Sequence, residues 1–263
     1  MNHSPLEIAA NYHLTAAHKA EMPTQILFFR AVLAGALIAL AAFGANSAYA
    51  LIEDQAVAKL ISALLFPSGL AMVLLCGGEL FTSSCLMPLA AGKNGVSIHG
   101  ILRCWTVIFL GNFVGAATIA LLTVASRQMD ASFIQATLHI AESKYGLAWP
   151  DAFFRGMLCN LLVCTAVWMS YGTSSNSGKI VALYFPIVLF VLTSTEHSVT
   201  NMYYFTAAFA AGPMEGITFY GFLTHHLLPV TLGNIIGGSV LFGGLIWLSF
   251  LAGDKNKNHT INP

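Results

Sequence analysis

Two acidic residues, Glu79 and Glu196, interrupt the longest apolar runs of a 263-residue chain in which only 8% of residues are charged. Each follows a Phe-Pro pair, Phe66-Pro67 or Phe185-Pro186, and each is followed by a polar cluster. A charged group at membrane depth is costly unless it faces the protein interior or a water-filled path, so such groups are functional candidates. Two of them in corresponding places, one beside His197, predict a pore for a small solute.

His197 is the only one of the nine histidines that we expect at mid-membrane. Imidazole titrates near neutrality and can therefore gain, lose or relay a proton. An anion in a low-dielectric pore needs such compensation, because its desolvation costs several kcal/mol or more. The structural alternative is a neutral histidine that ties two helices together. The place of His197 in an interrupted helix, with no other cation nearby, favours the functional interpretation.

The polar residues near His197 each allow a functional and a structural interpretation. A carboxylate of Glu79 or Glu196 at the narrow point would favour cations, but we expect both to accept hydrogen bonds from unwound backbone amides. The hydroxyls of Thr82 and Ser83 could donate to a solute or to His197. Lys144 is either a solvated loop lysine or, at a vestibule, a charge that concentrates anions.

Composition places the chain in a bilayer, since 57% of its residues are hydrophobic and a soluble domain usually has about 25% charged residues. The formal net charge of zero gives no basis for nucleic-acid binding. We expect the five cysteines to be free buried thiols, with packing favoured over a pore role for Cys76. No nucleophile, metal cluster or cofactor motif is recognisable, so we expect no enzyme activity, no cofactor and no bound metal.

Six apolar stretches are long enough to span a hydrocarbon core, which takes about 20 residues. The second and fifth are too long for one straight helix and are interrupted by polar residues, which predicts two broken helices whose halves meet near the midplane. The six stretches are 26–50, 57–91, 100–125, 152–172, 180–211 and 227–251. Together they form a predicted transmembrane domain, 26–251, followed by a cytoplasmic tail, 252–263.

The N-terminal segment, 1–25, is predicted to hold a helix over residues 5–20. Ser4-Pro5-Leu6-Glu7 has the form of a capping box with proline at the first helical position. Leu6, Ala10, Leu14 and Ala17 then share one face. The helix is expected to lie in the membrane interface or to pack against a neighbouring subunit.

Loop charges predict that both termini are cytoplasmic in a multi-pass protein of the plasma (inner) membrane, because basic residues favour the cytoplasmic side. This orientation puts seven lysines and arginines inside and four outside. The inside set is Lys19, Arg30, Lys93, Arg103, Lys179, Lys255 and Lys257, and the outside set is Lys59, Arg127, Lys144 and Arg155.

The two halves of the chain repeat each other. Phe28-Phe29-Arg30 matches Phe153-Phe154-Arg155, the two Phe-Pro pairs match, and Leu110–Gly115 matches Leu232–Gly237 in the same order. Three spans in each half require the halves to run in opposite senses through the membrane, which places a solute site where they meet. We expect the glycines of the last pair to pack helices closely and Asn112 and Asn234 to be structural.

Four segments of the chain are distinctive: Cys76–Ser83, Cys159–Trp168, Glu196–Met202 and Pro229–Gly238. In these segments the chain resembles the formate/nitrite transporter family, and the resemblance extends over about residues 5–251. The resemblance implies an aquaporin-like fold of six spans as two inverted three-helix repeats, assembled as a homopentamer with one pore per protomer. Family members pass formate, nitrite or hydrosulfide, coupled to protons or as the neutral acid.

The resemblance also implies residue roles. His197 matches the central pore histidine, Thr82 the threonine that hydrogen-bonds it, and Lys144 the vestibule lysine. Asn160 and Asn201 match asparagines near the histidine. The matched constrictions are Phe66, Leu70 and Phe190, with Leu80 and Phe81 beside the threonine. Thr200 and Thr193-Ser194-Thr195 depart from the family pattern and make the surroundings of the pore more polar.

The expected function is therefore a proton-linked channel or transporter for small monovalent anions, with formate first and nitrite or hydrosulfide as alternatives. A neutral-solute channel of the aquaporin type is a rival from another class, although its paired Asn-Pro-Ala motifs are absent. A membrane enzyme with His197 and Glu196 as acid and base is a second rival.

Overall fold

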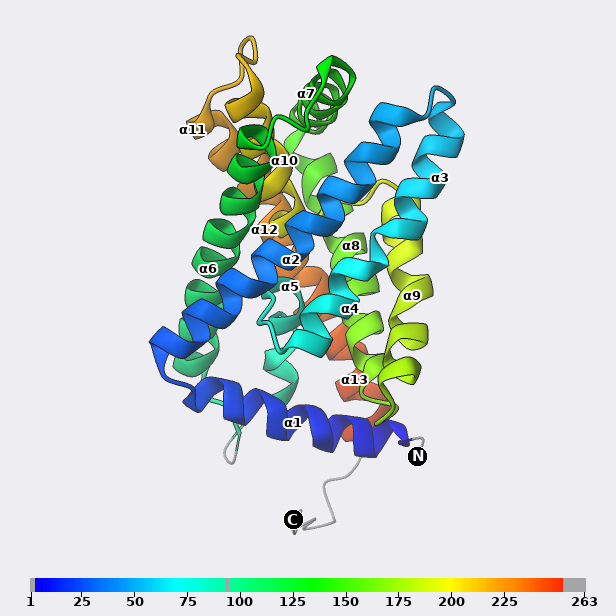
Figure 1. The fold of residues 1–263 in the computed structure, drawn as a ribbon. Coiled ribbons are helices and arrows are strands. Elements are labelled where there is room, and N and C mark those ends of the chain that lie inside the picture. Colours follow the sequence, from blue (N-terminus) through cyan, green and yellow to red (C-terminus); the bar gives the residue numbers. More distant parts are fainter. Residues whose placement is uncertain (1–2, 93–94, 253–263) are drawn as a thin grey trace.

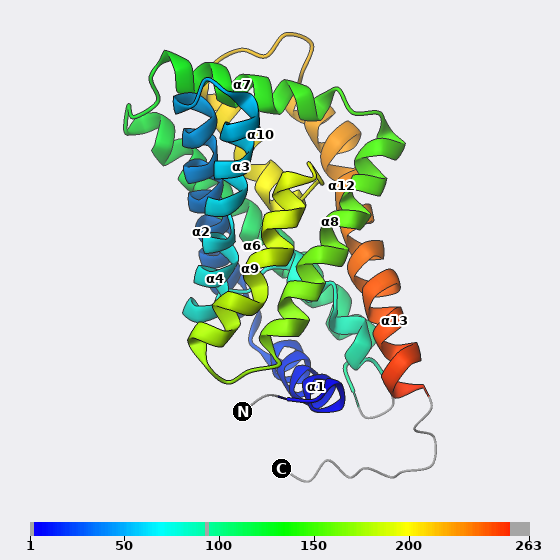
Figure 2. The same cartoon turned by 90° about the vertical axis from the view of Figure 1, so that its right-hand side faces the viewer.

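The computed structural model describes residues 3–92 and 95–252, which are almost entirely helical (Figures 1 and 2). No strand occurs within these ranges, apart from one isolated bridge between Ala91 and Val96. The all-helical fold agrees with the sequence prediction. The predicted tail, 252–263, lies outside the described residues except for its first position.

Five helices are long and apolar enough to span a membrane: Thr24–Leu51, Gln55–Cys76, Ile98–Ala125, Trp149–Ser170 and Phe219–Leu251. The other predicted span, 180–211, is divided into α9 (Asn176–Leu192) and α10 (Ser198–Ala211). The count of six crossings therefore stays a prediction. The single-helix spans are α2 (Thr24–Leu51), α6 (Ile98–Ala125) and α8 (Trp149–Ser170), and the last span runs through α11 (Phe219–Gly221), η2 (Phe222–Leu227), α12 (Leu228–Ile235), η3 (Ile236–Gly243), α13 (Gly244–Ile246) and η4 (Trp247–Leu251).

The second predicted span is a broken helix. It begins with α3 (Gln55–Leu65) and α4 (Pro67–Cys76), which end at Gly77 in a left-handed conformation (φ 73°) that glycine adopts without strain. After an extended linker, the chain forms the short α5 (Phe81–Ser84) and η1 (Met87–Ala90). We expected the break over 77–83, and the linker covers only 77–80, so Thr82 and Ser83 lie in a helical turn. The exposed Cys76 at this break corrects the expectation that all five cysteines are buried.

The second break separates α9 from α10 and is held in the same way as the first (Figure 2). Asn112 accepts from the Phe81 amide (2.8 Å) and donates to the carbonyls of Ala31 (2.7 Å) and Glu79 (2.9 Å). Asn234 makes the equivalent bonds with Ser198, Gly156 and Glu196. Each asparagine therefore satisfies backbone groups that an interrupted helix exposes, which supports the predicted repeat and the structural role of both residues.

Glycines bring α6 against α2 and the last span against α8. A Cβ on Gly115 would lie 2.0 Å from the carbonyl oxygen of Val32, and a Cβ on Gly237 would lie 2.2 Å from that of Met157. Backbones approach this closely only where a small residue separates them. The contacts confirm the close-packing role expected for the repeated glycines.

Replacing Gly237 with alanine should destabilise the bundle by about 1–3 kcal/mol, because the added methyl group must push two backbones apart. Gly244 in the same helix is the matched control, since a Cβ there meets nothing within 4 Å. Gly244→Ala should leave the melting temperature in detergent unchanged or slightly raised. Equal melting temperatures for the two variants would contradict the packing argument.

The helix α1 (Pro5–Glu21) crosses one end of the bundle, and α7 (Ala131–Tyr145) crosses the other (Figure 1). The capping box predicted at Ser4 and Glu7 is present. The predicted apolar face leaves Leu6 and Leu14 exposed, while Ile8, Tyr12, Ala16 and Lys19 face the bundle. The exposed leucines are therefore available to lipid or to a neighbouring subunit.

The helix α7 was not anticipated from the sequence, which we interpreted as a loop between spans three and four. Its N-terminus is capped by the carboxylate of Asp130, which accepts from the Phe133 amide (2.9 Å). This bond, together with one from Ser132, lowers the pKa of the Asp130 carboxyl. The helix positions Lys144 in its last turn.

Candidate functional site

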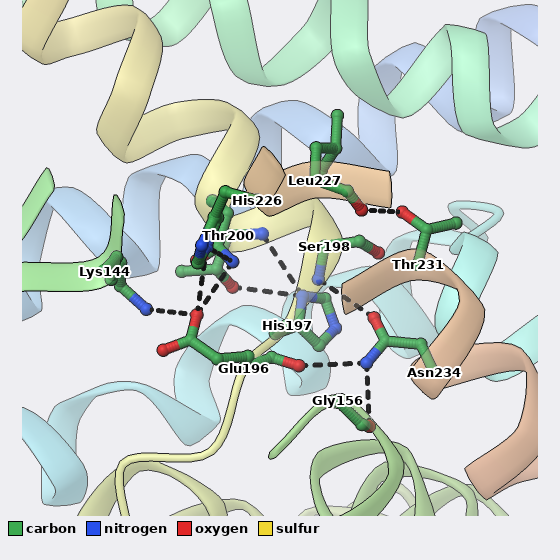
Figure 3. A network of polar contacts seen from close by, with 11 residues as sticks. Lys144, Gly156, Glu196, His197, Ser198, Thr200, His226, Leu227, Thr231 and Asn234 are labelled. Carbon is green, nitrogen blue, oxygen red and sulfur yellow. Dashed lines mark hydrogen bonds and ion pairs between the residues drawn. The ribbon is translucent and has the colours of Figure 1, made fainter. Parts of the chain in front are cut away.

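His197 lies at the second helix break and caps the N-terminus of α10 (Figure 3). Its Nδ1 accepts from the Thr200 amide (3.2 Å) and lies 3.1 Å from the Thr200 hydroxyl. An accepting Nδ1 places the ring proton on Nε2, which lies 2.9 Å from Oγ1 of Thr82. The Thr200 hydroxyl therefore gives the ring an additional partner.

Thr82 faces His197 from α5, the first half of the repeat. Its carbonyl oxygen accepts from Nδ2 of Asn160 (3.1 Å), which also donates to the carbonyl of Asn234 (2.7 Å). Asn160 thus holds the threonine backbone and makes no hydrogen bond to His197. Because the Thr82 hydroxyl accepts from Nε2–H, its own proton is free to be donated to a solute.

Glu196 precedes His197 and is almost fully buried. Its Oε2 atom accepts hydrogen bonds from Nζ of Lys144 (2.8 Å) and from Nδ2 of Asn201 (2.8 Å). Nε2 of His226 lies 3.5 Å from the same oxygen. The expectation that this carboxylate accepts from unwound backbone amides is wrong. Asn234 already accepts from the Ser198 amide, which leaves the carboxylate free to pair with cationic and amide side chains.

Lys144 is not a loop residue, because it belongs to the last turn of α7. Its ion pair with Glu196 leaves only 18% of the lysine side chain and 4% of the glutamate side chain exposed. Its Nζ also lies 5.7 Å from the centre of the Tyr204 ring, a favourable position for a cation. The pair holds one positive and one negative charge close to His197.

A second ion pair occupies the equivalent place in the first half. Nζ of Lys19 lies 2.6 Å from Oε2 of Glu79 and 3.0 Å from Oγ of Ser84. Burial disfavours the charged lysine, but the Glu79 carboxylate beside it raises the pKa of Lys19 overall. Glu79 therefore also pairs with a side chain rather than with freed backbone amides, which corrects the expectation for it.

The sequence contained a signal for this second pair that we did not use. Lys19 precedes Arg30, and Lys144 precedes Arg155, by the same number of residues. Each arginine offers its carbonyl oxygen to the amide of the glutamate that the lysine pairs with, at 3.0 Å for Glu79 and 3.3 Å for Glu196. The repeat therefore includes the helix that precedes each set of spans.

A cavity of about 620 Å³, here called the vestibule, leads from the α7 end of the molecule to His197. Its lining includes Lys144, Arg155, Glu196 and Asn201. Phe66 and Phe190 also line it. Their rings meet edge to face with centroids 5.1 Å apart, and the Phe190 ring lies 5.8 Å from the His197 ring. An apolar pair therefore lines the charged cavity directly beside the histidine.

The other predicted site residues lie away from the vestibule. Leu70, Leu80 and Phe81 are buried, and the Phe81 ring packs on Phe109 with centroids 5.1 Å apart. The hydroxyl of Ser83 donates to the Leu80 carbonyl (2.9 Å), so Ser83 is not brought to His197. Among the described residues, no group of three or more His, Cys, Asp or Glu side chains is arranged to hold a metal ion.

His226 is a site residue that the sequence analysis missed. We assigned it to a span end because we began the last span at residue 227, but that helix starts at Phe219. The ring is fully buried, and its Nε2 lies 2.9 Å from Nδ2 of Asn201. A second imidazole therefore belongs to the polar network around Glu196 (Figure 3).

Known proteins resemble this chain over nearly its whole length. The family model for the formate/nitrite transporter matches residues 6–248. The formate channel FocA of Haemophilus influenzae is 36% identical over 261 residues, which cover 91% of this chain and 92% of that protein. A probable formate transporter of Methanothermobacter thermautotrophicus is 35% identical, with coverage of 94% and 97%.

Solved structures agree with the sequence relatives. A pentameric formate channel with formate bound superposes with a TM-score of 0.80 at 31% identity, covering 87% of this chain and 98% of that one. An FNT family ion channel superposes with a TM-score of 0.86 at 28% identity, covering 93% and 99%. The family match covers nearly the whole chain, and the broken helices and the paired repeats are those expected from the resemblance. The chain therefore belongs to the formate/nitrite transporter family of membrane channels and transporters.

Proposed function

We propose that this protein is a formate channel in which anion passage is linked to protons through His197. The observation that best supports the proposal is the contact of 2.9 Å between Thr82 and His197, the second of which lines the vestibule. The ring stands where a charged cavity gives way to the Phe66–Phe190 pair. Relatives described as formate channels add to this support.

The proposed sequence of steps begins at the ion pair of the vestibule. Lys144 attracts a monovalent anion, and Glu196 balances its charge so that the anion is not trapped. At the end of the vestibule the anion meets an apolar pair, where its desolvation would cost several kcal/mol. Passage therefore requires a nearly neutral species.

His197 and Thr82 supply the means of neutralisation. A proton from the vestibule reaches Nδ1 through the Thr200 hydroxyl and makes the ring an imidazolium. The Nε2 proton then moves to the Thr82 oxygen while the Thr82 hydroxyl proton passes to the anion, so the ring is left neutral. The acid then crosses the apolar pair and ionises beyond it, towards the side of Lys19 and Glu79. The two ion pairs give the path a cationic group at each end.

Proteoliposomes loaded with formate, nitrite or hydrosulfide test the proposal directly. Purified protein should give protein-dependent flux of all three anions, fastest for formate. Nitrite or hydrosulfide moving fastest would select the alternative substrate. Water flux without anion flux would favour the aquaporin-type rival, and chemical conversion of formate would favour the enzyme. Either result would overturn the proposal.

Assembly as a homopentamer in the plasma (inner) membrane, with cytoplasmic termini, completes the proposal. The described ends agree with termini on one side, since α1 and η4 contact each other at the end opposite α7 (Figure 1). An apolar groove between α2, α3–α4 and α9 leaves Leu40, Leu64 and Leu75 exposed for lipid or a neighbouring protomer. A native mass of one chain in nanodiscs would refute the pentamer.

A further inference from the structure

His226 is a buried titratable group that the proposed steps do not use. It lies in the π-helical turn η2, with no exposed surface, and its ring faces Phe205 with centroids 5.1 Å apart. Its Nε2 lies between Nδ2 of Asn201 (2.9 Å) and Oε2 of Glu196 (3.5 Å). The ring is thus directed at the carboxylate that holds Lys144.

The hydrogen bonds decide where the neutral ring has its proton. The Asn201 amide nitrogen donates one hydrogen to Glu196 and has its second hydrogen for Nε2 of His226. Nε2 is then an acceptor, and the single ring proton is on Nδ1. Two buried atoms have no hydrogen-bond partner among the described residues: Nδ1 of His226 and Oδ1 of Asn201.

A second proton on the ring cannot be accommodated by the same bonds. Nε2–H would then face the Asn201 amide nitrogen at 2.9 Å, donor against donor, while Oε2 of Glu196 is the acceptor within reach. The imidazolium therefore displaces Asn201 and closes onto Glu196. Because Glu196 then has a second cation, its hold on Lys144 weakens.

We propose that His226 is a positioning residue that takes Glu196 from Lys144 when it gains a proton. The vestibule then presents a free lysine charge to an entering anion at acid pH and a neutral ion pair at alkaline pH. The charged and titratable groups that face His226 are Glu196 from the α9–α10 linker, Lys144 from α7 and His225 on its own helix. Its effect concerns anion capture, whereas His197 acts on passage, and the inference rests on the proposed formate function.

The test separates capture from passage by measuring formate flux against formate concentration at pH 8 and pH 5.5. On acidification, the half-saturating formate concentration of the wild type should fall, because the freed lysine charge adds positive potential to the vestibule. This fall should be roughly three- to tenfold larger in the wild type than in His226→Asn. Maximal flux should be the same in both. Asparagine suits the variant because it can accept from Asn201 in place of the neutral ring. His225→Asn, at the exposed neighbouring position, is the control and should behave as wild type.

Two results would overturn the inference while leaving the formate function intact. One is an unchanged pH dependence of the half-saturating concentration in His226→Asn or, if that variant does not assemble, in His226→Gln. The other is a lowered maximal flux with unaltered half-saturation, which a merely structural role would produce. Absence of formate flux in the wild type would instead refute the proposed function.

A structural measurement on the wild type tests the inference without a transport assay and without variants. Structures in nanodiscs at pH 8 and pH 5.5 should show Nε2 of His226 closing onto Oε2 of Glu196 and Nζ of Lys144 moving away from its 2.8 Å contact. An unchanged Lys144–Glu196 distance at acid pH would contradict the inference even if formate is transported.

Discussion

The variant His197→Asn should have a formate flux at acid pH at least about tenfold below that of the wild type, or a flux that no longer depends on pH. The reason is that proton transfer by a positioned side chain contributes a rate factor of this size or more. Asparagine is a favoured N-cap and can still accept from the Thr200 amide, so α10 should form and the protein should assemble. It cannot be protonated near neutral pH. Flux in proteoliposomes between pH 5.5 and pH 8 measures the effect.

Thr82 offers a graded form of the same experiment. Thr82→Val removes the hydroxyl next to Nε2 of His197 and nearly preserves shape, so it should cause a milder defect. Thr82→Ser keeps the hydroxyl and serves as the control, with flux close to wild type. If His197→Asn transported formate with unchanged rate and pH profile, His197 would be a helix-capping residue and no part of a relay.

Lys144→Ala is the second variant with a large expected effect. It removes the cation from a pair whose glutamate is 4% exposed, so the vestibule changes from neutral to negative and repels the anion. Flux at limiting formate should fall by roughly tenfold or more, and less at high ionic strength because salt screens the repulsion. Initial rates at low and high salt provide the measurement.

Matched variants distinguish the charge of Lys144 from its shape. Lys59→Ala changes a lysine of α3 that does not line the vestibule, and flux should stay at the wild-type level. Lys144→Met combined with Glu196→Gln removes both charges and should recover part of the flux lost in Lys144→Ala. A double variant as impaired as the single one would show that repulsion by Glu196 is not the cause.

The fold could be predicted largely because its signals are local or repeated in the sequence. The apolar runs, the glutamates within them and the Phe-Pro pairs indicated the broken helices, and the structure places their linkers at residues 77–80 and 193–197. The paired Gly-Asn segments indicated close packing and asparagines that hold the breaks. The helix α7 was missed because its mixed polar composition does not differ from that of a loop.

The site was harder to predict because its side-chain partners come from distant segments. Family resemblance paired Thr82 with His197, but nothing in the local sequence of Glu196 indicates that Lys144, 52 positions away, lies 2.8 Å from it. Glu79 and Lys19 pose the same problem. His226 was missed as a site residue because hydropathy places span boundaries only to within several residues. Its helix begins at Phe219, before the apolar run from which we drew the span.

The central claim is that formate crosses the apolar pair together with a proton. Simultaneous recording of formate uptake and internal pH in the same wild-type proteoliposomes, with the membrane potential clamped, tests it most directly. We expect one proton to enter with each formate, at a rate that the membrane potential hardly changes. Formate entry without internal acidification, accelerated by an inside-positive potential, would contradict it.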